Sequence, residues 1–498
     1  MRSIPRQVDL LIVGNGALGL SLADVMAEHC SAIAVVGPAD RAAGASQAAG
    51  AMLGCFGEVT TETLRTVAGR KKFELSMAAQ RMWPAVLERL AAYVPQGAPP
   101  LQVAADSHLI LNSRGSELDS RNFRAVLEAL AEYGSAWEEV DPEAIPGYRP
   151  RTDHRALRAI RVDGEGAVDA RRVLQALQTG LEHRGVHVVD GVAVALTQNN
   201  DAVTGVRLED GSIIEAGTVV VTAGARSQAL LQTALEPTEI MPMFAGRGVA
   251  MVGLRTEGAP FETVVRTTNR AFACGLHVIP LGGGREYFGA TNGVAGKPKT
   301  APPLFDIRFL VDCAMEQLDE GASRHDLEAY RIGNRPVTLD GFPLIGWSAR
   351  AGLYIMTGTY RDGFHCAPLL ASHAADQLRG GEGLIDPMFT PTRAPIATRT
   401  VEQSVDEFVN HSMAAWFESG ANAARQFSTG RLEELYRQQG NALYDRLGID
   451  YGLSPDLLAF AFSELASGSN ILRYLRSRDG SLPAGSARSR GAAGAERV

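Results

Sequence analysis

The chain has 498 residues, 45% of them hydrophobic and 21% charged, so it is long enough for two or three structural units with a sizeable core. Its formal net charge is −8 and it has no dense run of lysine and arginine, which argues against nucleic acid and anionic membrane surfaces as partners. The five cysteines are widely spaced and form no CxxC pair, so neither a disulfide framework nor a metal site is expected.

The amino-terminal stretch MRSIPRQVDLLIVG has an apolar run of only four residues before its first glycine. A signal peptide needs a longer apolar run, and a membrane helix needs about 20 apolar residues. We therefore expect a cytoplasmic protein that does not contact a membrane.

Residues 8–40 are typical of a strand, a turn, a helix and a second strand. The apolar VDLLIV precedes GNGALG, an amphipathic stretch follows, and AIAVV closes the unit. Gly14, Gly16 and Gly19 have the spacing GxGxxG, which permits a tight turn and brings a pyrophosphate to a helix N-terminus. This placement favours a dinucleotide site, and a tight turn without a ligand is the alternative.

The second strand ends without the acid that such a unit normally offers to the ribose hydroxyls. Gly37 stands at that position, and Asp40 follows three residues later. Asp40, a water molecule or a backbone group would have to replace the missing carboxylate. The loss of one charged hydrogen bond costs about 1.5–3 kcal/mol, which a large cofactor with many other contacts can tolerate.

The remaining elements follow in chain order. Residues 61–95 and 119–133 have helical spacing, then GAVDARRVLQALQTGLEHRG predicts a helix and short strands follow as far as TVVVTAG. Alternating stretches within 240–293 predict antiparallel strands of a second sheet. Helices are expected near 306–320 and across 400–478, before a Gly-, Ala-, Ser- and Arg-rich tail that cannot bury enough surface to order itself. The predicted fold class is α/β (α+β) with a Rossmann-like domain.

The small-residue segment AGASQAAGAML (43–53) follows the second strand and resembles the D-amino-acid oxidase and glycine oxidase family of FAD enzymes. Further segments agree with the family in order: GAVDARRVLQAL, VAVALT, TVVVTAGAR, HVIPLGGGREYFGATN, RPVTLDGFPLIG and TGTYRDGFHCAP. The match spans roughly residues 8–385. The resemblance implies FAD as cofactor. The family's covalently flavinylated members use a cysteine near RPVTLDG that this chain lacks, so non-covalent FAD is expected.

The resemblance also implies a division into domains. Segments 1–60, 155–235 and 326–390 would form the FAD-binding domain, and 61–154 with 236–325 an antiparallel-sheet substrate domain. A helical C-terminal extension would occupy 391–478, followed by a disordered tail over 479–498.

The cofactor contacts are expected from the glycine turn and from the resemblance. Ser46 would contact the pyrophosphate, the backbone at Val194 would meet the adenine, and the helix after Gly363 would point its positive end at the pyrimidine side of the flavin. The full set is Gly14, Gly16, Ala17, Leu18, Gly19, Asp40, Ser46, Gly50, Ala51, Met52, Val194, Ala223, Gly224, Gly358, Gly363, Phe364 and His365.

Two arginines and two histidines are the candidate catalytic residues. Arg335, in NRPVTLDG, matches the arginine that binds the substrate carboxylate in glycine oxidase, and its planar fork suits a carboxylate. A structural arginine paired with Asp340 is the alternative. Arg361 would serve either the fold or the pocket. His277 stands where the family tends to have tyrosine, and with a pKa near neutrality it would accept the amine proton or bind another substrate group. His277 and His365 could equally be packed core residues.

The resemblance implies an FAD-dependent oxidoreductase that oxidises the C–N bond of an amino acid or related amine to an imine, by hydride transfer to flavin N5. Oxygen is the expected acceptor, although the lysine that activates oxygen in sarcosine oxidase-like relatives has no counterpart between residues 73 and 296. The alternatives are a flavin dehydrogenase acting on a 2-hydroxy acid or a carrier-bound substrate, and an FAD-holding subunit of a larger complex.

The C-terminal extension lies outside the resemblance. Its apolar residues are expected to form the inner face of a small helical bundle on the oxidoreductase body. A lid, a homodimer contact or a docking surface for a carrier protein are the alternatives. Such an appendage favours a specialised, biosynthetic oxidation over plain catabolism of glycine.

Overall fold

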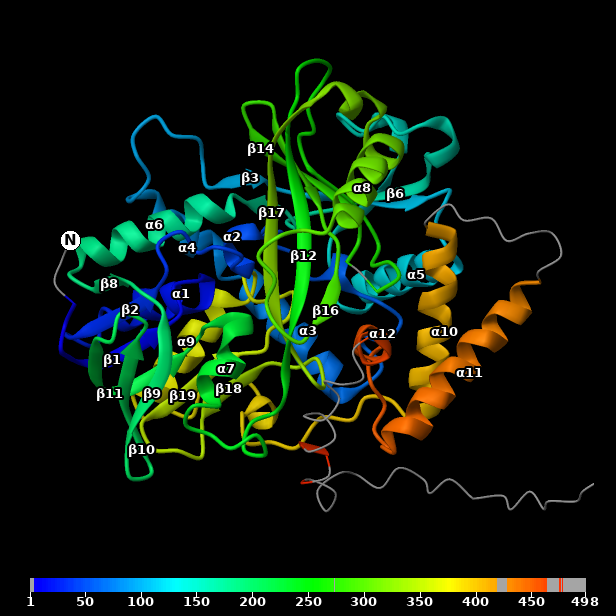
Figure 1. Ribbon diagram of the computed structural model, residues 1–498. Helices are drawn as coiled ribbons and strands as arrows, with labels where there is room; N and C mark the ends of the chain where they lie inside the picture. Colours follow the sequence, from blue (N-terminus) through cyan, green and yellow to red (C-terminus); the bar gives the residue numbers. More distant parts are fainter. Residues whose placement is uncertain (1–3, 273, 419–427, 464–473, 476, 478–498) are drawn as a thin grey trace, which may run out of the picture.

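The computed structural model describes residues 4–272, 274–418, 428–463, 474–475 and 477. Two large sheets form the body of the molecule, with helices on their outer sides (Figure 1). The described α-helices are α1 (Ala17–Met26), α2 (Ala45–Ala48), α3 (Val67–Gln80), α4 (Trp83–Ala91), α5 (Glu117–Glu132), α6 (Ala170–His183), α7 (Ser227–Leu231), α8 (Leu304–Cys313), α9 (Ala367–Leu378), α10 (Val401–Glu418), α11 (Thr429–Leu447) and α12 (Pro455–Ser463).

The first sheet is a mixed sheet with a parallel centre, in which β1 lies between β2 and β11. Its strands in spatial order are β18 (Leu344–Trp347), β19 (Leu353–Thr357), β11 (Ile213–Val221), β1 (Gln7–Val13), β2 (Ile33–Gly37) and β8 (His187–Asp190), with β10 (Ala202–Leu208) beside β11 and β9 (Ala193–Asn199) beside β10. The predicted strand–helix–strand unit at the amino terminus is confirmed.

The buried run of β1 supplies two hydrophobic cores at once. Leu10 and Ile12 face one core, and Leu11 and Val13 face the other, because successive side chains of a strand point to opposite faces. Helices α1, α6 and α9 cover the first of these faces. A strand buried on both sides reads as a continuous apolar run, which is why the sequence predicts it so clearly.

The second sheet is larger and mostly antiparallel. Its long strands β12 and β17 pair along almost their whole length and stand upright in the centre of Figure 1. The strands in spatial order are β16 (Gly293–Ala295), β12 (Met243–Leu254), β15 (Arg285–Gly289), β14 (His277–Gly282), β13 (Val264–Thr267), β4 (Ser107–Asn112), β6 (Ala156–Val162) and β5 (Trp137–Val140), with β17 (Asp326–Thr338) beside β12; β3 (Gln102–Ala104) and β7 (Ala167–Val168) form a separate pair.

Two strands lie in a different sheet from the one that the expected domain boundaries imply. Residues 155–235 and 326–390 were assigned to the FAD-binding domain, yet β6 pairs with β4 and β17 pairs with β12 in the second sheet. Both β6 and β17 thus belong to the second, mostly antiparallel sheet, and the chain returns to the first sheet only after each of them. The domain division otherwise stays a prediction.

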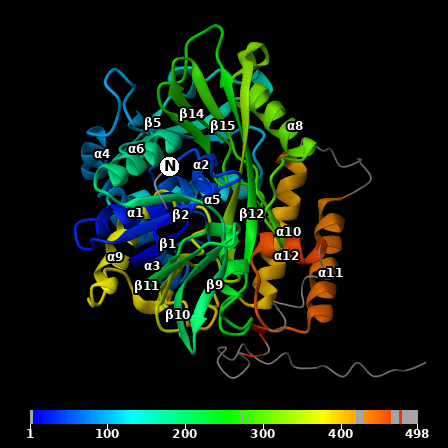
Figure 2. The same cartoon turned by 60° about the vertical axis from the view of Figure 1, so that its left-hand side comes forward.

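The predicted C-terminal helices are confirmed as α10, α11 and α12, which lie at the side of the second sheet in Figures 1 and 2. Phe408, Leu457 and Phe460 are buried in the same core as β1 and β11, so the extension packs on the body. The ring of Phe460 lies 5.2 Å from that of Phe244 on β12. Phe417 is half-exposed, and the predicted disordered tail lies outside the described residues.

None of the described helices is both long and apolar enough to cross a membrane.

Candidate active site

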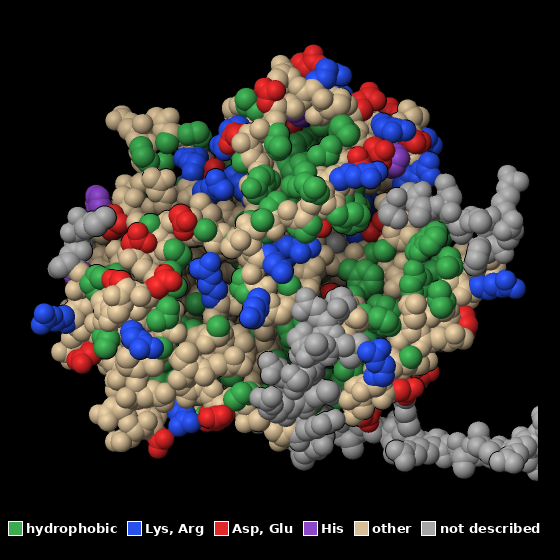
Figure 3. Space-filling view, viewed as in Figure 1, with side chains coloured by type: hydrophobic (Ala, Val, Ile, Leu, Met, Phe, Trp, Pro, Cys, Tyr) green, Lys and Arg blue, Asp and Glu red, His purple; other side chains and the backbone are tan. Residues whose placement is uncertain are grey.

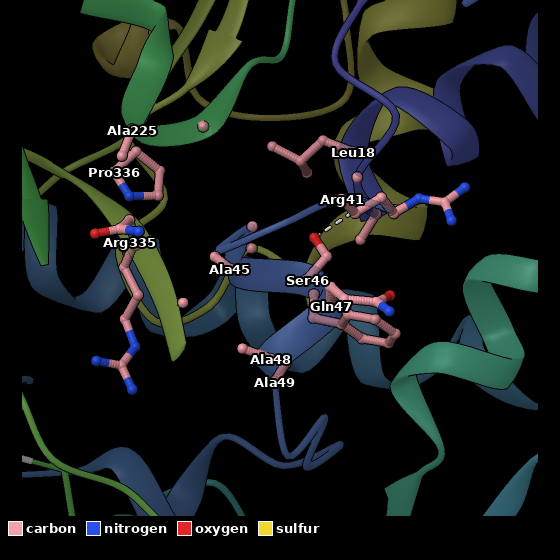
Figure 4. A pocket seen from close by; sticks show the side chains of 18 of the residues that line it. Leu18, Arg41, Ala45, Ser46, Gln47, Ala48, Ala49, Ala225, Arg335 and Pro336 are labelled. Atoms are coloured by element: carbon pink, nitrogen blue, oxygen red, sulfur yellow. Dashed lines mark hydrogen bonds between the residues drawn. The ribbon is translucent and has the colours of Figure 1, made fainter. Parts of the chain in front are cut away.

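A deep cavity opens between the carboxyl ends of β1 and β11 and the inner side of the second sheet. Its walls come from the glycine turn before α1, the segment around α2, the middle of β17 and the loop after β19. Figure 4 shows Ser46 and Gln47 on α2 near the middle of this space and Arg335 extending from β17 on one side. The carboxyl edge of a parallel sheet is where such folds bind ligands.

The glycine turn brings Ser46 to the start of α1. Gly14 has a φ of +124°, and a Cβ added there would lie 2.4 Å from the backbone oxygen of Thr222. The hydroxyl of Ser46 accepts a hydrogen bond from the backbone N–H of Ala17 at 3.0 Å. The Ser46 O–H is therefore held at a helix N-terminus, where a phosphate is favoured.

The expected role of Asp40 is wrong. Asp40 is exposed, does not line the cavity, and accepts a hydrogen bond from the backbone N–H of Ala42 at 3.0 Å. Arg41, the next residue, has a left-handed φ of 49°, and Asp40 lies at the surface.

Asn15 occupies the place of the missing acid. A Cβ added at Gly37 would lie 2.4 Å from Cγ of Asn15, and the Asn15 side chain donates to the carbonyl of Pro38 at 2.9 Å. Arg41 lines the cavity beside it and donates to the Asn15 carbonyl at 2.9 Å. Burial lowers the pKa of Arg41. Sequence reasoning missed both residues, although an arginine next to Asp40 was a visible signal.

Three other expected cofactor residues do not line the cavity either. Gly19 serves packing, because a Cβ there would lie 1.8 Å from the Gly14 carbonyl oxygen. Gly358 has a φ of +74° and makes the turn after β19. Val194 is 42% exposed, whereas its neighbour Ala193 lines the cavity. The exposure of its side chain does not bear on the expected contact between the Val194 backbone and the adenine, which stays a prediction.

The cavity brings together the other predicted residues. They are Gly14, Gly16, Ala17, Leu18, Ser46, Gly50, Ala51, Met52, Ala223, Gly224, His277, Arg335, Arg361, Gly363, Phe364 and His365.

The side chain of His365 lines the cavity but binds the backbone of α3. Its Nε2 lies 2.8 Å from the carbonyl of Ser76 in α3, and its own carbonyl accepts from the indole N–H of Trp83 at 2.8 Å. Trp83 stacks on Phe364 with ring centroids 5.8 Å apart. Burial lowers the pKa of His365. These contacts indicate that His365 is a packing residue that fixes the turn before α9, and they give no support to a catalytic role.

Arg335 is the guanidinium best placed to bind a carboxylate. Its Nη1 donates to the carbonyl of Thr291 at 3.3 Å and to Oδ1 of Asn292 at 3.2 Å, and among the described residues it has no carboxylate partner. The alternative pairing with Asp340 is excluded, because Arg393 binds that carboxylate. A Cβ at Gly248 would lie 2.4 Å from the Arg335 guanidinium, so β12 leaves room for it.

His277 is buried and neutral. Its Nδ1 lies 2.8 Å from the carbonyl of Gly275, and its ring stacks on Tyr287 with centroids 5.7 Å apart. Burial, reinforced by the adjacent Arg266, lowers the pKa of His277 to about 4. The expectation of a pKa near neutrality is therefore wrong, and His277 cannot hold a proton at neutral pH.

An ion-pair cluster beside His277 was missed by sequence reasoning. Glu58 lies 2.9 Å from Nη2 of Arg266 and 3.9 Å from Nη1 of Arg361, and it accepts from Nδ2 of Asn269 at 3.2 Å. Burial alone would raise the pKa of Glu58, but the two guanidinium groups outweigh it and lower the pKa to about 2. Glu58 follows the resemblance segment by only five residues, and nothing local shows that Arg266 reaches it.

The residues present fit a flavin dinucleotide. The turn at Gly14 and Gly16 leaves backbone N–H groups and the Ser46 hydroxyl at the start of α1, and a Cβ at Gly16 would already lie 3.0 Å from Ser46 Oγ. The segment around α2 is made of small side chains, so its backbone can approach a flat ring. Within the described residues, no group of three or more His, Cys, Asp or Glu side chains converges as a metal site would.

Comparisons with known proteins agree with this geometry. The bifunctional protein ThiO/ThiG of Synechocystis sp. is 25% identical over 480 residues, which cover 93% of this chain and 65% of that protein. The D-amino acid dehydrogenase of Methylobacterium sp. is 29% identical over 237 residues, covering 46% of this chain and 53% of that enzyme. This chain spans 52% to 65% of the length of the first three curated relatives that it matches.

Glycine oxidase of Geobacillus kaustophilus is 25% identical over 391 residues, covering 76% of this chain and 94% of the enzyme. The crystal structure of glycine oxidase from this organism aligns with a TM-score of 0.66 and 20% identity over 78% of this chain and 99% of that chain, which shows the fold. The family model for the FAD dependent oxidoreductases matches residues 9–377. The chain therefore belongs to the FAD-dependent oxidoreductase family, and its cofactor is FAD.

Proposed function

We propose that this protein oxidises the C–N bond of a small amino acid, or of a related amine that carries a carboxylate, to an imine that water then hydrolyses. The observation that carries the proposal is Arg335, a guanidinium in the FAD cavity that has no carboxylate partner among the described residues. A guanidinium that lacks a carboxylate partner in the described part of the chain is suited to bind the carboxylate of a substrate.

Bound FAD supplies the acceptor for the hydride that leaves the substrate α-carbon. The chain's own part is to orient the substrate. Arg335 would hold the carboxylate from the side of β17, and the paired Glu58 and Arg266 line the same cavity. His277, neutral between these groups, adds no charge that would repel the substrate amine. Positioning of this kind can supply most of a rate enhancement.

The substrate amine would have to arrive neutral. The pKa of His277 is lowered to about 4, and burial raises that of Tyr287 to about 12. Neither group is poised to accept a proton near neutral pH, so we assign the loss of that proton to the free substrate before it binds.

Anaerobic mixing of the purified yellow protein with D- and L-amino acids, N-methyl amino acids, amines and 2-hydroxy acids tests the proposal. Loss of flavin absorbance with a carboxylated amine, but not with the matching amine that lacks the carboxylate, is the expected result. Bleaching by 2-hydroxy acids alone would overturn it, as would a flavin that no amine reduces unless a partner protein is added.

The Arg335→Ala variant sharpens this test. We expect its KM for the reducing amino acid to rise at least about 100-fold, since a charged hydrogen-bonding pair is lost, with partial recovery in Arg335→Lys. Arg331→Ala provides the control, because Arg331 precedes Arg335 on β17 and lies over the Tyr287 ring, outside the cavity lining. An unchanged KM in Arg335→Ala would assign the carboxylate to another residue.

Oxygen is the proposed electron acceptor. A dehydrogenase is the second candidate, favoured by the D-amino acid dehydrogenase among the relatives. Admission of air after anaerobic reduction separates them: rapid recovery of the yellow colour with peroxide supports the oxidase, and recovery only with an artificial acceptor supports the dehydrogenase. Acid precipitation tests non-covalent binding, since free FAD should remain in the supernatant.

Cytoplasmic location and a homodimer contact through the C-terminal helices complete the proposal. Hydrophobic side chains lie over these helices on the face shown in Figure 3, and Phe417 and Leu435 are about half-exposed. Cell fractionation tests the location. Light scattering tests the dimer. A monomer that binds a carrier protein would show that the C-terminal helices contact a carrier protein and not a second copy of this chain.

A further inference from the structure

The C-terminal helices reach the active site through a second cavity. This cavity is lined by residues of α3, by His411 of α10 and by Asp456 of α12. It adjoins the FAD cavity, because Glu58, Tyr360 and Arg361 line both. The family match ends at residue 377, so the extension supplies part of a wall that the family model does not describe.

Tyr360 stands between the two cavities and is held from both sides. Its hydroxyl lies 2.7 Å from Oδ2 of Asp456 and 2.7 Å from Nδ2 of Asn292. Its φ is 50°, a conformation that non-glycine residues adopt only when their surroundings hold them there. Arg361 lies over the Tyr360 ring at 4.9 Å.

The direction of these hydrogen bonds is determined by Asp456. An ionised carboxylate only accepts, so the Tyr360 hydroxyl donates its hydrogen to Asp456 and offers a lone pair to Asn292. Asn292 must then donate through Nδ2, which also reaches the carbonyl of Phe272 at 2.9 Å. The remaining Asn292 oxygen accepts from Nη1 of Arg335 at 3.2 Å. One chain of hydrogen bonds thus joins Asp456 to Arg335.

Asp456 is itself fixed at the start of α12. Its Oδ1 accepts from the backbone N–H of Leu457 at 3.0 Å and from the hydroxyl of Ser454. Helix α12 packs on β16, directly after the loop that holds Asn292, and Phe460 packs on Phe244 of β12. The anchor of the chain is therefore a rigid helix end.

We propose that Asp456 of the C-terminal extension is a positioning residue for the substrate carboxylate, acting through Tyr360 and Asn292 on Arg335. This inference rests on the proposed function, which assigns the carboxylate to Arg335. Without Asp456 the Tyr360 hydroxyl loses the acceptor that holds it, and the Asn292 amide, which also donates to the Phe272 carbonyl, loses a fixed partner at Nδ2. Arg335 then loses an acceptor that fixes its plane, and bidentate binding of a carboxylate depends on that plane.

Titration of the FAD-loaded protein with acetate tests the chain of hydrogen bonds. Acetate has a carboxylate but no amine or hydroxyl, so it binds without reaction and its Kd is read from the change in the flavin spectrum. We expect the Kd to rise about tenfold in Asp456→Ala and in Tyr360→Phe. The double variant should be no weaker than either single variant, because both changes break the same chain. Asp456→Asn keeps an acceptor oxygen and should recover part of the affinity.

Asp406→Ala is the matched control. Asp406 is a partly exposed aspartate of α10 that pairs with Arg437 inside the extension and lines neither cavity, and its loss should leave the acetate Kd within twofold of wild type. FAD content and melting temperature are measured for every variant, since a merely structural role of Asp456 would lower both without changing the Kd of the loaded fraction.

The outcomes separate this inference from the proposed function. If the wild type binds acetate and is reduced by a carboxylated amine, unchanged or additive Kd values in Asp456→Ala and Tyr360→Phe overturn the positioning role alone. If the wild type binds acetate but no amine reduces it, the proposed function fails and the Kd values still decide the inference. A wild type that binds FAD but no carboxylate overturns both.

Discussion

The two ends of the FAD cavity are lined by different kinds of chemical group. The end at α1 uses backbone N–H groups, small side chains and one hydroxyl, contributed by the glycine turn and by the segment around α2. The end between β12, β14 and β17 uses long charged side chains, with Arg266 and Glu58 paired and Arg335 without a carboxylate partner in the part of the chain that the structure describes. The first end depends on close approach of backbone, whereas the second depends on which charges are already neutralised.

This difference predicts how each end fails. A Cβ added at the α1 end should abolish FAD binding, because the packed backbone there leaves no space for it. Removing a charge should damage the second end in proportion to the charge left without a partner. The four predictions below test this contrast.

The largest effect is expected at the glycine turn. A Cβ at Gly19 would lie 1.8 Å from the carbonyl oxygen of Gly14, which belongs to the backbone and cannot move aside alone. We expect Gly19→Ala to lower the free energy of unfolding by about 4 kcal/mol or more, and the protein to be purified without FAD. Denaturant unfolding and the flavin absorbance of the purified protein are the measurements.

Gly430→Ala is the control for this substitution. Gly430 lies in α11 with no atom near its added Cβ, so alanine should leave FAD bound and raise stability by up to about 1 kcal/mol. A stable Gly19→Ala protein that is purified with its full content of FAD would show that the α1 end has room for the added Cβ.

A smaller effect is expected from Glu58→Gln. The side chain of Arg266 is only 5% exposed and would lose its carboxylate, which should cost about 2–3 kcal/mol after allowance for the partial exposure of Glu58. Glu139→Gln, which removes an exposed partner of Arg158, should cost much less. Equal effects of the two substitutions would contradict the contrast.

Glu58→Gln should also change the acid sensitivity of the protein. Because the folded pKa of Glu58 is lowered to about 2 from an ordinary value of 4.5, its carboxylate stabilises the fold above pH 4.5 and loses that contribution as the pH falls towards 2. The wild type should therefore lose more stability than Glu58→Gln over this interval, as measured by denaturant unfolding at several pH values.

His411 should contribute about 1 kcal/mol of pH-dependent stability where the extension meets the body. Its Nδ1 accepts from the backbone N–H of Phe272 at 2.9 Å, and burial lowers its pKa to about 4 from 6.5. The neutral ring stabilises the fold above pH 6.5, and this contribution is lost as the pH falls towards 4. The melting temperature should drop less between pH 7 and pH 5 in His411→Gln than in the wild type, and the exposed His29→Gln should behave as wild type.

The smallest effect concerns His277 and the pH profile of catalysis. Since the pKa of His277 is lowered to about 4, its titration lies below the working range. The rising limb of kcat/KM should follow the pKa of the substrate amine and move when an amine of lower pKa is used. His277→Gln should leave the position of that limb unchanged, and a shift of the limb in this variant would show that the ring accepts the amine proton.

Much of the fold was predictable because its signals are local. The apolar run of β1, the glycines of the turn and the small residues of 43–53 each act within a few positions of themselves. The same holds for the helical spacing of α10, α11 and α12. Sequence reasoning failed at the end of β2: Asp40 is exposed and lies outside the cavity lining, and Asn15 stands beside Gly37 instead.

The charged end of the site was only partly predictable. Arg335 and Arg361 were found by resemblance, but their surroundings were not. Glu58 and Arg266 are 208 residues apart in the chain, and their pairing is what lowers the pKa of Glu58. Burial and the adjacent Arg266 lower the pKa of His277, against an opposing effect of Glu58, and no local pattern indicates this.

The sequence by itself determined the cofactor end of this protein, since tight turns and close backbone approach depend on which residues have small side chains. Only the tertiary structure decided the substrate end. There, burial and the distance between opposite charges set which arginine is paired, which histidine is neutral and which aspartate of the C-terminal helices reaches Tyr360. These quantities belong to contacts between distant segments, and they exist only once the two sheets and the extension have packed together.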